Sequence, residues 1–277
     1  MANKIRVAIT GAAGLVGSRI ADLLTTSFDI IPLTHDDIDI TDKKNVEAVA
    51  SSLSFDYLIH CAAYTNVDGA EQNEKQAYVI NVDGLKNIFA ICKQKSAKLI
   101  LISTDFVFDG TNPPYFENST PNPLSVYAKS KFEGEQIIKD NAMTIRISYP
   151  YRSTYKKSDF ARTIKRLLQE GKAIHAITDS LFTPTHIDDV AQALKHLIPS
   201  YSHDIFHIVG DGALSPFDAA HIIAAQFDFD TSLIKPVSFE DFFKSRAKRP
   251  QYSDIRSKKN DFAPMRSFEK GVLSIES

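Results

Sequence analysis

Residues 4–24 read KIRVAITGAAGLVGSRIADLL. A short apolar run over 4–9 leads into glycines at positions 11, 14 and 17, and an amphipathic stretch covers about 14–26. A strand that enters a helix through a glycine turn lets the backbone approach a phosphate, and the helix N-terminus offers it unpaired N–H groups and partial positive charge. The stretch therefore predicts a strand–turn–helix unit that binds the pyrophosphate of a dinucleotide. The alternative is a glycine-rich helix entry without a ligand.

The same rhythm continues to about residue 150. Apolar runs at 29–33, 56–61, 98–103 and 143–148 alternate with amphipathic stretches at 42–53, 70–95 and 124–141. Nearly continuous apolar strands separated by helices indicate a parallel sheet covered on both faces. We predict an α/β protein with a Rossmann-type doubly wound parallel sheet and a smaller C-terminal substrate-binding lobe.

The predicted boundary between these two parts lies near residue 150. Residues 1–150 form the dinucleotide-binding domain, which also receives parts of about 180–208, and residues 151–277 form mainly the substrate-binding lobe. In that lobe we expect helices at 158–171 and 187–198 and irregular, phenylalanine-rich chain over 211–235 and 236–260.

Composition narrows the setting. The chain has 277 residues and a formal net charge of −2, so no overall charge attracts nucleic acid or an anionic membrane. Its two cysteines, Cys61 and Cys92, lie in apolar runs, which favours a reducing compartment without a disulfide framework. Thr10, Gly11 and Gly14 interrupt the N-terminal apolar run, which is not typical of a signal peptide. We expect a cytoplasmic protein without a nucleic-acid or membrane partner.

The stretch SVYAKSKFEGE at 125–135 places Tyr127 and Lys131 one helical turn apart on one face of the predicted helix. The apolar run at 98–103 ends in Thr104 and Asp105, where strand ends of an open sheet face the ligand crevice. A phenol has a pKa of about 10, and moving it about 3 units towards neutrality takes roughly 4 kcal/mol. A neighbouring ammonium supplies that only in a desolvated crevice, and an ordinary surface pair is the alternative.

The dinucleotide turn, the hydroxyl at a strand end and the Tyr-x-x-x-Lys pair together resemble the short-chain dehydrogenase/reductase superfamily, in its extended form acting on nucleotide sugars. Within it, the chain resembles the family of dTDP-4-dehydrorhamnose reductases. The matching stretches run from end to end: TGAAGLVG (10–17), CAAYTNVDGAE (61–71), Asn81, ISTDFVFDG (102–110), YAKSKFEGE (127–135), RISYPY (146–151), FTPTHIDDVA (182–191) and KRPQYSDI (248–255).

The resemblance implies NAD(P)H-dependent reduction of the 4-keto group of a nucleotide-linked 6-deoxysugar, dTDP-4-dehydro-L-rhamnose first among them. Tyr127 would be the general acid, Lys131 would lower the Tyr127 pKa and bind the nicotinamide ribose, and Thr104 would hydrogen-bond the substrate oxygen. Two alternatives stay open. One is a nucleotide-sugar epimerase or dehydratase on the same scaffold, although Phe106 stands where a dehydratase has an acid. The other is a non-catalytic regulatory subunit resembling the β subunit of methionine adenosyltransferase.

The resemblance also assigns binding residues. Those for the cofactor are Gly11, Gly14, Leu15, Val16, Thr34, Asp39, Ile40, Ala62, Ala63, Tyr64, Thr65, Ile102, Tyr127 and Lys131. Those for the substrate are Thr104, Asp105 and Tyr149, and charge alone adds Arg249. Arg249 lies in the basic stretch 244–259 and would meet the diphosphate, the alternative being a solvated basic face. A homodimer is expected on the resemblance alone.

Cofactor preference depends on the end of the second strand. Thr34 occupies the position where an acid would bind the ribose 2′-hydroxyl, and Arg19 and His35 are expected within reach. This favours NADP(H) slightly over NAD(H). The acids at 36, 37, 39 and 42 are interpreted as a loop and a helix start, and no metal site is predicted.

Overall fold

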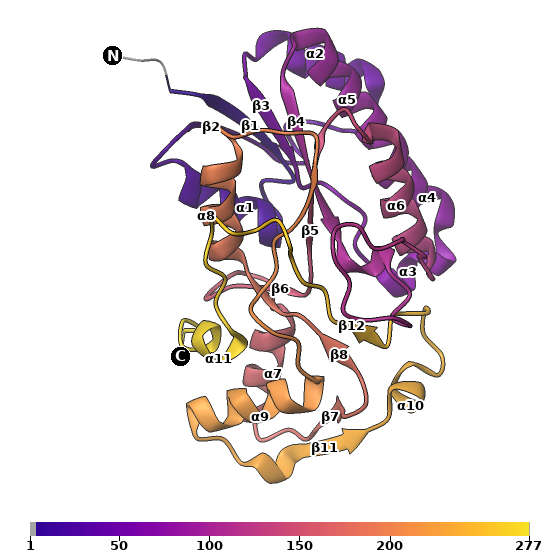
Figure 1. Ribbon diagram of the computed structural model, residues 1–277, viewed down its shortest axis with the longest axis vertical. Helices are drawn as coiled ribbons and strands as arrows, with labels where there is room; N and C mark the ends of the chain where they lie inside the picture. Colours follow the sequence, from indigo (N-terminus) through magenta and orange to yellow (C-terminus); the bar gives the residue numbers. More distant parts are fainter. Residues whose placement is uncertain (1–3, 277) are drawn as a thin grey trace.

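A six-stranded parallel sheet forms the centre of the computed structural model, which describes residues 4–276 (Figure 1). Its strand order is β10-β5-β4-β3-β1-β2. The strands are β1 (Arg6–Thr10), β2 (Asp29–Leu33), β3 (Tyr57–His60), β4 (Lys98–Thr104), β5 (Met143–Ile147) and β10 (Ile205–His207). The chain reverses its direction of travel across the sheet between β1 and β3, so the ligand crevice of a doubly wound sheet lies there. The predicted fold class is confirmed.

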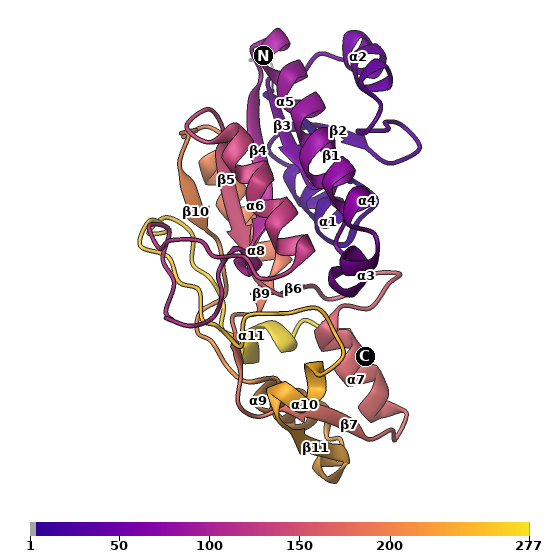
Figure 2. The ribbon, with the colours of Figure 1, turned by 90° about the vertical axis from the view of Figure 1, so that its right-hand side faces the viewer.

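Helices cover both faces of this sheet (Figures 1 and 2). On one face lie α1 (Leu15–Leu24) and α8 (Ile187–Leu197), and on the other α2 (Lys43–Ser52), α5 (Gly84–Lys95) and α6 (Val126–Ile138). Local chemistry sets where they begin. The Asp42 carboxylate accepts from the backbone N–H groups of Lys44 and Asn45, and the Ser125 hydroxyl accepts from the N–H of Ala128.

The single helix expected over 70–95 is instead a broken one. It consists of α3 (Val67–Gln72), α4 (Glu74–Tyr78), a π-helical turn (Val79–Asp83) and α5. Asn73 separates the first two pieces with a non-helical backbone. The prediction of one helix was wrong because apolar periodicity does not register one extra residue in a turn, which is what a π-helical turn inserts.

The remaining elements gather beyond the carboxyl ends of the strands, in the lower half of Figure 1. They are β6 (Pro150–Tyr151), α7 (Phe160–Gln169), β7 (Ile174–Ile177), β8 (Leu181–Phe182), β9 (Thr185–His186), α9 (Pro216–Phe227), β11 (Ile234–Val237), α10 (Phe239–Phe243), β12 (Tyr252–Ser253) and α11 (Phe268–Val272). Two apolar clusters of their own hold them together. We keep the assignment of residues 151–277 to a mainly substrate-binding lobe as a proposal.

The expectation of irregular chain over 211–235 was wrong. The helix α9 occupies Pro216–Phe227 and opens with a capping box in which Ser215 and Asp218 bond each other's backbone N–H groups. Proline at its first position fits the same start. Across residues 4–276, no helix combines the length and apolar character that a membrane span requires.

The centre of the sheet is a row of fully buried side chains, and its loss has a predictable cost. Ile59 on β3 pairs in register with Ile9 on β1 and Ile100 on β4, all at 0% exposure. We expect Ile59→Ala to lower the free energy of unfolding by about 2–5 kcal/mol, measured by urea denaturation, because a cavity opens between the sheet and the helices α1 and α8 that cover this face. Leu273→Ala, at a side chain 65% exposed, is the control and should change it by less than about 0.5 kcal/mol. Equal losses in the two variants would contradict this packing.

Candidate active site

A cavity of about 720 Å³ opens at the carboxyl ends of β1, β2 and β3. This is the crevice that the strand order predicts. Most of the predicted cofactor residues line it, namely Gly11, Gly14, Leu15, Val16, Thr34, Asp39, Ile40, Ala62, Ala63 and Thr65. The other four, Tyr64, Ile102, Tyr127 and Lys131, do not line it; the backbone of Tyr64 is bound by Asn81, and the carbonyl oxygen of Ile102 accepts from Lys131.

The glycine turn and the end of β3 approach each other closely. Gly11 has a φ of +68°, and a Cβ there would lie 2.7 Å from the backbone nitrogen of Ala62. A Cβ on Gly17 would lie 2.4 Å from the carbonyl oxygen of Gly11. Gly14 at the N-cap brings no side chain to the start of α1, so the first N–H groups of the helix remain available to an anion in the cavity.

The end of β2 is arranged differently from the prediction. The Thr34 backbone N–H and hydroxyl both donate to the Asp37 carboxylate, at 2.8 and 2.6 Å. Those hydrogen bonds hold the pKa of Asp37 below its usual value, so a negative charge lies beside Thr34. Arg19 makes a bidentate pair with Asp188 at 2.7 Å. The expectation that Arg19 is within reach of the ribose was therefore wrong, because α8 holds it, whereas His35 does line the cavity.

The structure brings together the three predicted catalytic residues. Tyr127 and Lys131 lie on the buried face of α6, and Thr104 ends β4. The Lys131 ammonium donates to the Ile102 carbonyl oxygen at 2.9 Å, and the Thr104 hydroxyl lies near enough to the Tyr127 phenol to lower the phenol's pKa. Lys131 also lies close enough to His60 and Cys61, at the end of β3, to act on their titration. Lys131 thus lies beside the part of the cavity wall that Cys61 forms, although none of the three residues lines the cavity itself.

Burial dominates the electrostatics of this group. It raises the pKa of Tyr127 to about 12, a rise that the Thr104 hydroxyl opposes and the Asp105 charge adds to. Burial also lowers the pKa of Lys131 to about 8, which the Glu135 charge opposes. The expected lowering of the Tyr127 pKa by Lys131 was wrong for the protein's own groups. The phenol is protonated at neutral pH, which suits a proton donor.

Asp105 lies directly behind the catalytic residues. It is 2% exposed, and its carboxylate accepts from the hydroxyls of Thr104 at 3.1 Å, Ser148 at 2.9 Å and Ser253. Burial nevertheless raises its pKa. The other predicted substrate residues, Tyr149 and Arg249, lie nearby. Burial raises the pKa of Tyr149, the Asp105 charge raises it further, and the Arg249 charge opposes the rise.

Two of those substrate residues have unusual surroundings. Tyr149 has a φ of +40°, a strained conformation of the kind that recurs at functional sites. Its ring lies 6.1 Å from that of Phe106, which in turn lies 5.9 Å from that of Tyr127. Arg249 pairs with Asp68 of α3 at 2.9 Å, so the residue expected to meet a diphosphate is held at the junction of the two halves by an acid.

The sequence predicts no role for Asn81, and the structure shows one. Its side chain accepts from the Tyr64 N–H at 2.8 Å and donates to the Tyr64 carbonyl oxygen and to Ser130 of α6. It therefore fixes the chain after β3 against the catalytic helix. Asn81 lies in a π-helical turn, and such turns are common at functional sites. The turn would have pointed to Asn81, but the sequence does not predict it.

Arg152 and Tyr155 were also missed. The Arg152 guanidinium donates to the Ser18 hydroxyl at 2.9 Å, and the Tyr155 hydroxyl donates to the Ala13 carbonyl oxygen. Both contacts bring the chain after β6 over the glycine turn. The sequence did not predict them because the partners lie more than 130 positions apart. Among the described residues, 4–276, no group of three or more His, Cys, Asp or Glu side chains is placed to hold a metal ion.

Comparison with known proteins gives a consistent result. The family model described as "RmlD substrate binding domain" matches residues 5–275. The chain belongs to that RmlD family. It is 34% identical to a dTDP-4-dehydrorhamnose reductase of Mycobacterium tuberculosis over 263 residues, covering 91% of this chain and 85% of the relative. A dTDP-4-keto-6-deoxy-D-glucose reductase of Streptomyces niveus is 30% identical, covering 88% of this chain and 86% of the relative.

A solved member of the RmlD family matches the whole structure. The dTDP-4-dehydrorhamnose reductase of Bacillus anthracis, solved in complex with NADP, superposes with a TM-score of 0.90 at 35% identity and 97% coverage of both chains. The architecture described above is therefore that of the family.

The close approach at Gly11 generates a prediction with a matched control. Gly11 and Gly171 have φ values of +68° and +67°, but only at Gly11 would a Cβ meet backbone. Alanine at either position should cost about 1–2 kcal/mol through the left-handed backbone. Gly11→Ala should in addition weaken NADPH binding by about ten-fold or more, measured by fluorescence titration, because the turn must move away from β3. Equal affinities in the two variants would show that this contact does not shape the cofactor cavity.

Proposed function

We propose that this RmlD-family protein is an NAD(P)H-dependent reductase of the 4-keto group of a nucleotide-linked 6-deoxysugar, converting dTDP-4-dehydro-L-rhamnose to dTDP-L-rhamnose. The observation that carries the proposal is the meeting of Thr104, Tyr127 and Lys131 beside Cys61, which lines the dinucleotide-type cavity. The relatives at 34% and 35% identity that carry this reductase's name support the choice of substrate.

The reaction needs little from the protein beyond proton supply and positioning. The bound nicotinamide supplies the hydride. A carbonyl that accepts a hydride becomes an alkoxide, which needs a proton and hydrogen-bond donors. Tyr127 holds that proton, because burial raises its pKa to about 12. Thr104 presents a hydroxyl beside the phenol, and Lys131 supplies positive charge one turn along α6.

Several expectations from the sequence belong to this proposal. NADP(H) is the proposed cofactor, supported by the NADP bound to the Bacillus anthracis relative and by Thr34 and His35 in the cavity wall. Asp37 beside Thr34 works against a 2′-phosphate, so the preference is slight. A homodimer and a cytoplasmic location stay predictions.

The epimerase, dehydratase and regulatory-subunit hypotheses remain rivals that experiment separates. Phe106, packed against Tyr127 where a dehydratase has an acid, disfavours that rival. The intact trio disfavours a purely regulatory role, because binding a partner would not require a buried lysine beside a buried phenol.

The direct test follows NADPH oxidation at 340 nm with dTDP-4-dehydro-6-deoxyglucose generated in situ, with and without the 3,5-epimerase that forms the L-sugar. We expect turnover only with the epimerase, and a loss of about 10²–10⁴-fold in kcat for Tyr127→Phe with NADPH affinity kept, since only the proton donor is removed.

Other outcomes have distinct meanings. Turnover without the epimerase would support the reductase activity but show that the substrate is a different 4-ketosugar. Cofactor binding with no turnover on any 4-ketosugar would reject the proposed activity in favour of the regulatory role. Full activity of Tyr127→Phe would reject Tyr127 as the acid.

Cofactor preference gives a second prediction. Asp37→Asn keeps an acceptor for Thr34 but removes a negative charge at the ribose end of the cavity. We expect kcat/KM for NADPH to rise about five-fold relative to NADH, because a like charge no longer faces the 2′-phosphate. Asp36→Asn in the same loop is the control. An equal change with both cofactors would mean that Asp37 does not sense the 2′-phosphate.

A further inference from the structure

A third ionisable residue shares the catalytic face of α6. Tyr127, Lys131 and Glu135 follow one another at four-residue intervals, so their side chains lie along one side of the helix. All three are buried, and Glu135 is 3% exposed. The proposed reaction assigns no step to Glu135. Glu135 lines a separate cavity of about 680 Å³, yet its side chain is buried, and a buried carboxylate without a step in the reaction needs another reason to be there.

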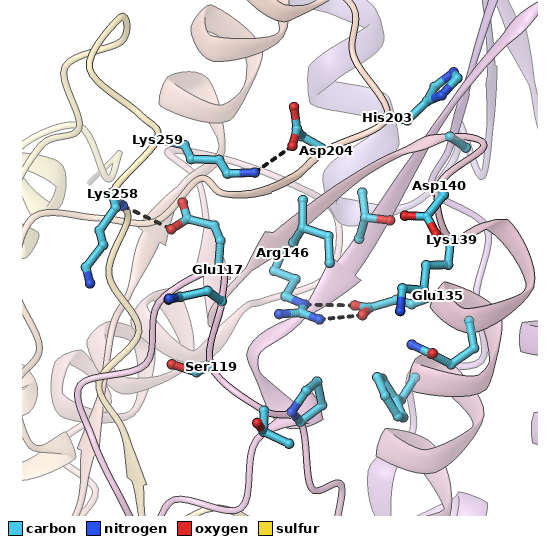
Figure 3. Close-up of a pocket in the computed structure, with 18 residues that line it drawn as sticks. Glu117, Ser119, Glu135, Lys139, Asp140, Arg146, His203, Asp204, Lys258 and Lys259 are labelled. Carbon is cyan, nitrogen blue, oxygen red and sulfur yellow. Dashed lines mark hydrogen bonds and ion pairs between the residues drawn. The ribbon is translucent and has the colours of Figure 1, made fainter.

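Glu135 is held by an arginine from the sheet. The Arg146 guanidinium on β5 donates from Nε to Oε1 at 3.0 Å and from Nη2 to Oε2 at 2.6 Å. Figure 3 shows the two side chains facing each other, Glu135 from the helix and Arg146 from the strand. In the sheet, Arg146 pairs with Ser103, the residue before Thr104. The pair therefore joins the helix that carries Tyr127 and Lys131 to the strand beside Thr104.

The surroundings leave this pair electrically balanced. His207 Nδ1 donates to the Arg256 carbonyl oxygen at 2.9 Å, and its Nε2 faces Arg146 Nη1 at 3.4 Å. Burial, followed by the Arg146 charge, lowers the pKa of His207 to about 4, so this imidazole is neutral. Glu117 is bound by the His207 and Lys258 N–H groups and by the Ser257 hydroxyl. Glu135 is thus the carboxylate that pairs with Arg146.

Stability alone does not account for the pair. Buried ion pairs recover their desolvation cost only in part, and apolar replacements are often as stable. The groups that surround the Lys131 ammonium suggest what else the Glu135–Arg146 pair does. On the side of β3, Lys131 faces His60 and, just after the strand, Cys61. Burial lowers the pKa of His60 to about 3 and raises that of Cys61 to about 12, so both are neutral near pH 7. From β4, Lys131 meets the Ile102 carbonyl oxygen, and from α6 the protonated Tyr127 and the Glu135 carboxylate.

We infer that Glu135 and Arg146 are positioning residues of the active site. Arg146 holds Glu135, and with it α6, in the register that points Tyr127 and Lys131 at Thr104, while the Glu135 carboxylate balances the buried Lys131 ammonium. The inference deepens the proposed function and rests on it for its catalytic part. Its electrostatic part can be measured without any substrate.

The test removes the charge of Glu135 and follows Lys131. Glu135→Gln keeps the shape and one acceptor for Arg146, and Glu135→Leu/Arg146→Met keeps a folded, apolar replacement should the single variant fail to fold. Protein labelled with ¹³C at lysine Cε is titrated by NMR, with the Lys131 signal assigned from Lys131→Arg. In parallel, kcat/KM is measured against pH.

The sign follows from the direction of the shift. Lys131 is protonated below its pKa of about 8 and loses its proton as the pH rises through that value. In Glu135→Gln, which leaves the Arg146 charge unpaired, the Lys131 titration and the alkaline limb of kcat/KM should both move about one unit to lower pH. In Glu135→Leu/Arg146→Met, which removes both charges, both should move in the same direction by less. Asp189→Leu/Arg266→Met, which removes an ion pair between α8 and the chain before α11, should move neither.

A folded Glu135 variant in which Lys131 titrates as in the wild type, with an unchanged alkaline limb, would overturn the inference. A wild-type protein that turns over no 4-ketosugar would reject the proposed function separately, and the NMR titration would still decide the role of the pair. A shift in the Asp189/Arg266 control as large as that in the Glu135 variants would assign the effect to general loosening and also overturn it.

Discussion

The Lys131 side chain is only 6% exposed, and its ammonium donates to the Ile102 carbonyl oxygen at 2.9 Å. A buried cation loses several kcal/mol of hydration, so it persists only where its partners are fixed. Ile102 lies two residues before Thr104 on β4, and Lys131 lies one turn after Tyr127 on α6. The same hydrogen bond that satisfies the charge therefore sets the helix against the strand and brings the phenol to the threonine hydroxyl. The Glu135–Arg146 pair repeats this arrangement one turn further along α6.

The substrate side depends on a second buried charge. Asp105 gathers hydroxyls from Thr104, from Ser148 after β5 and from Ser253 on β12. Because β12 pairs with β8, this junction connects the catalytic strand end to the elements beyond the sheet. The Asp68–Arg249 pair makes a second connection. The proposed sugar site thus lies between two polar contacts, one buried beneath Thr104 and one at the rim, whereas the cofactor cavity is lined mainly by strand ends of the sheet and by the glycine turn.

The sheet and the catalytic trio could be predicted from the sequence because their signals are local. Apolar runs located the five long strands within two residues of their observed bounds, and the amphipathic stretch at 124–141 located α6. Errors arose where a distant residue decides. Arg19 is held by Asp188, 169 positions away, and the Tyr127 pKa follows from tertiary burial. The helix α9 was missed although Ser215, Pro216 and Asp218 formed a local start signal, because its phenylalanines were interpreted as an irregular small core.

The central claim is that this fold delivers a hydride to the sugar C4 while Tyr127 delivers the proton. The most direct measurement supplies NADPH deuterated at the transferable C4 position, together with the epimerised 4-ketosugar, and locates the label in the product by NMR and mass spectrometry. The account predicts one deuterium at C4 of the 6-deoxysugar and none elsewhere. Product without the label at C4, or a label at another carbon, would contradict direct reduction at this site.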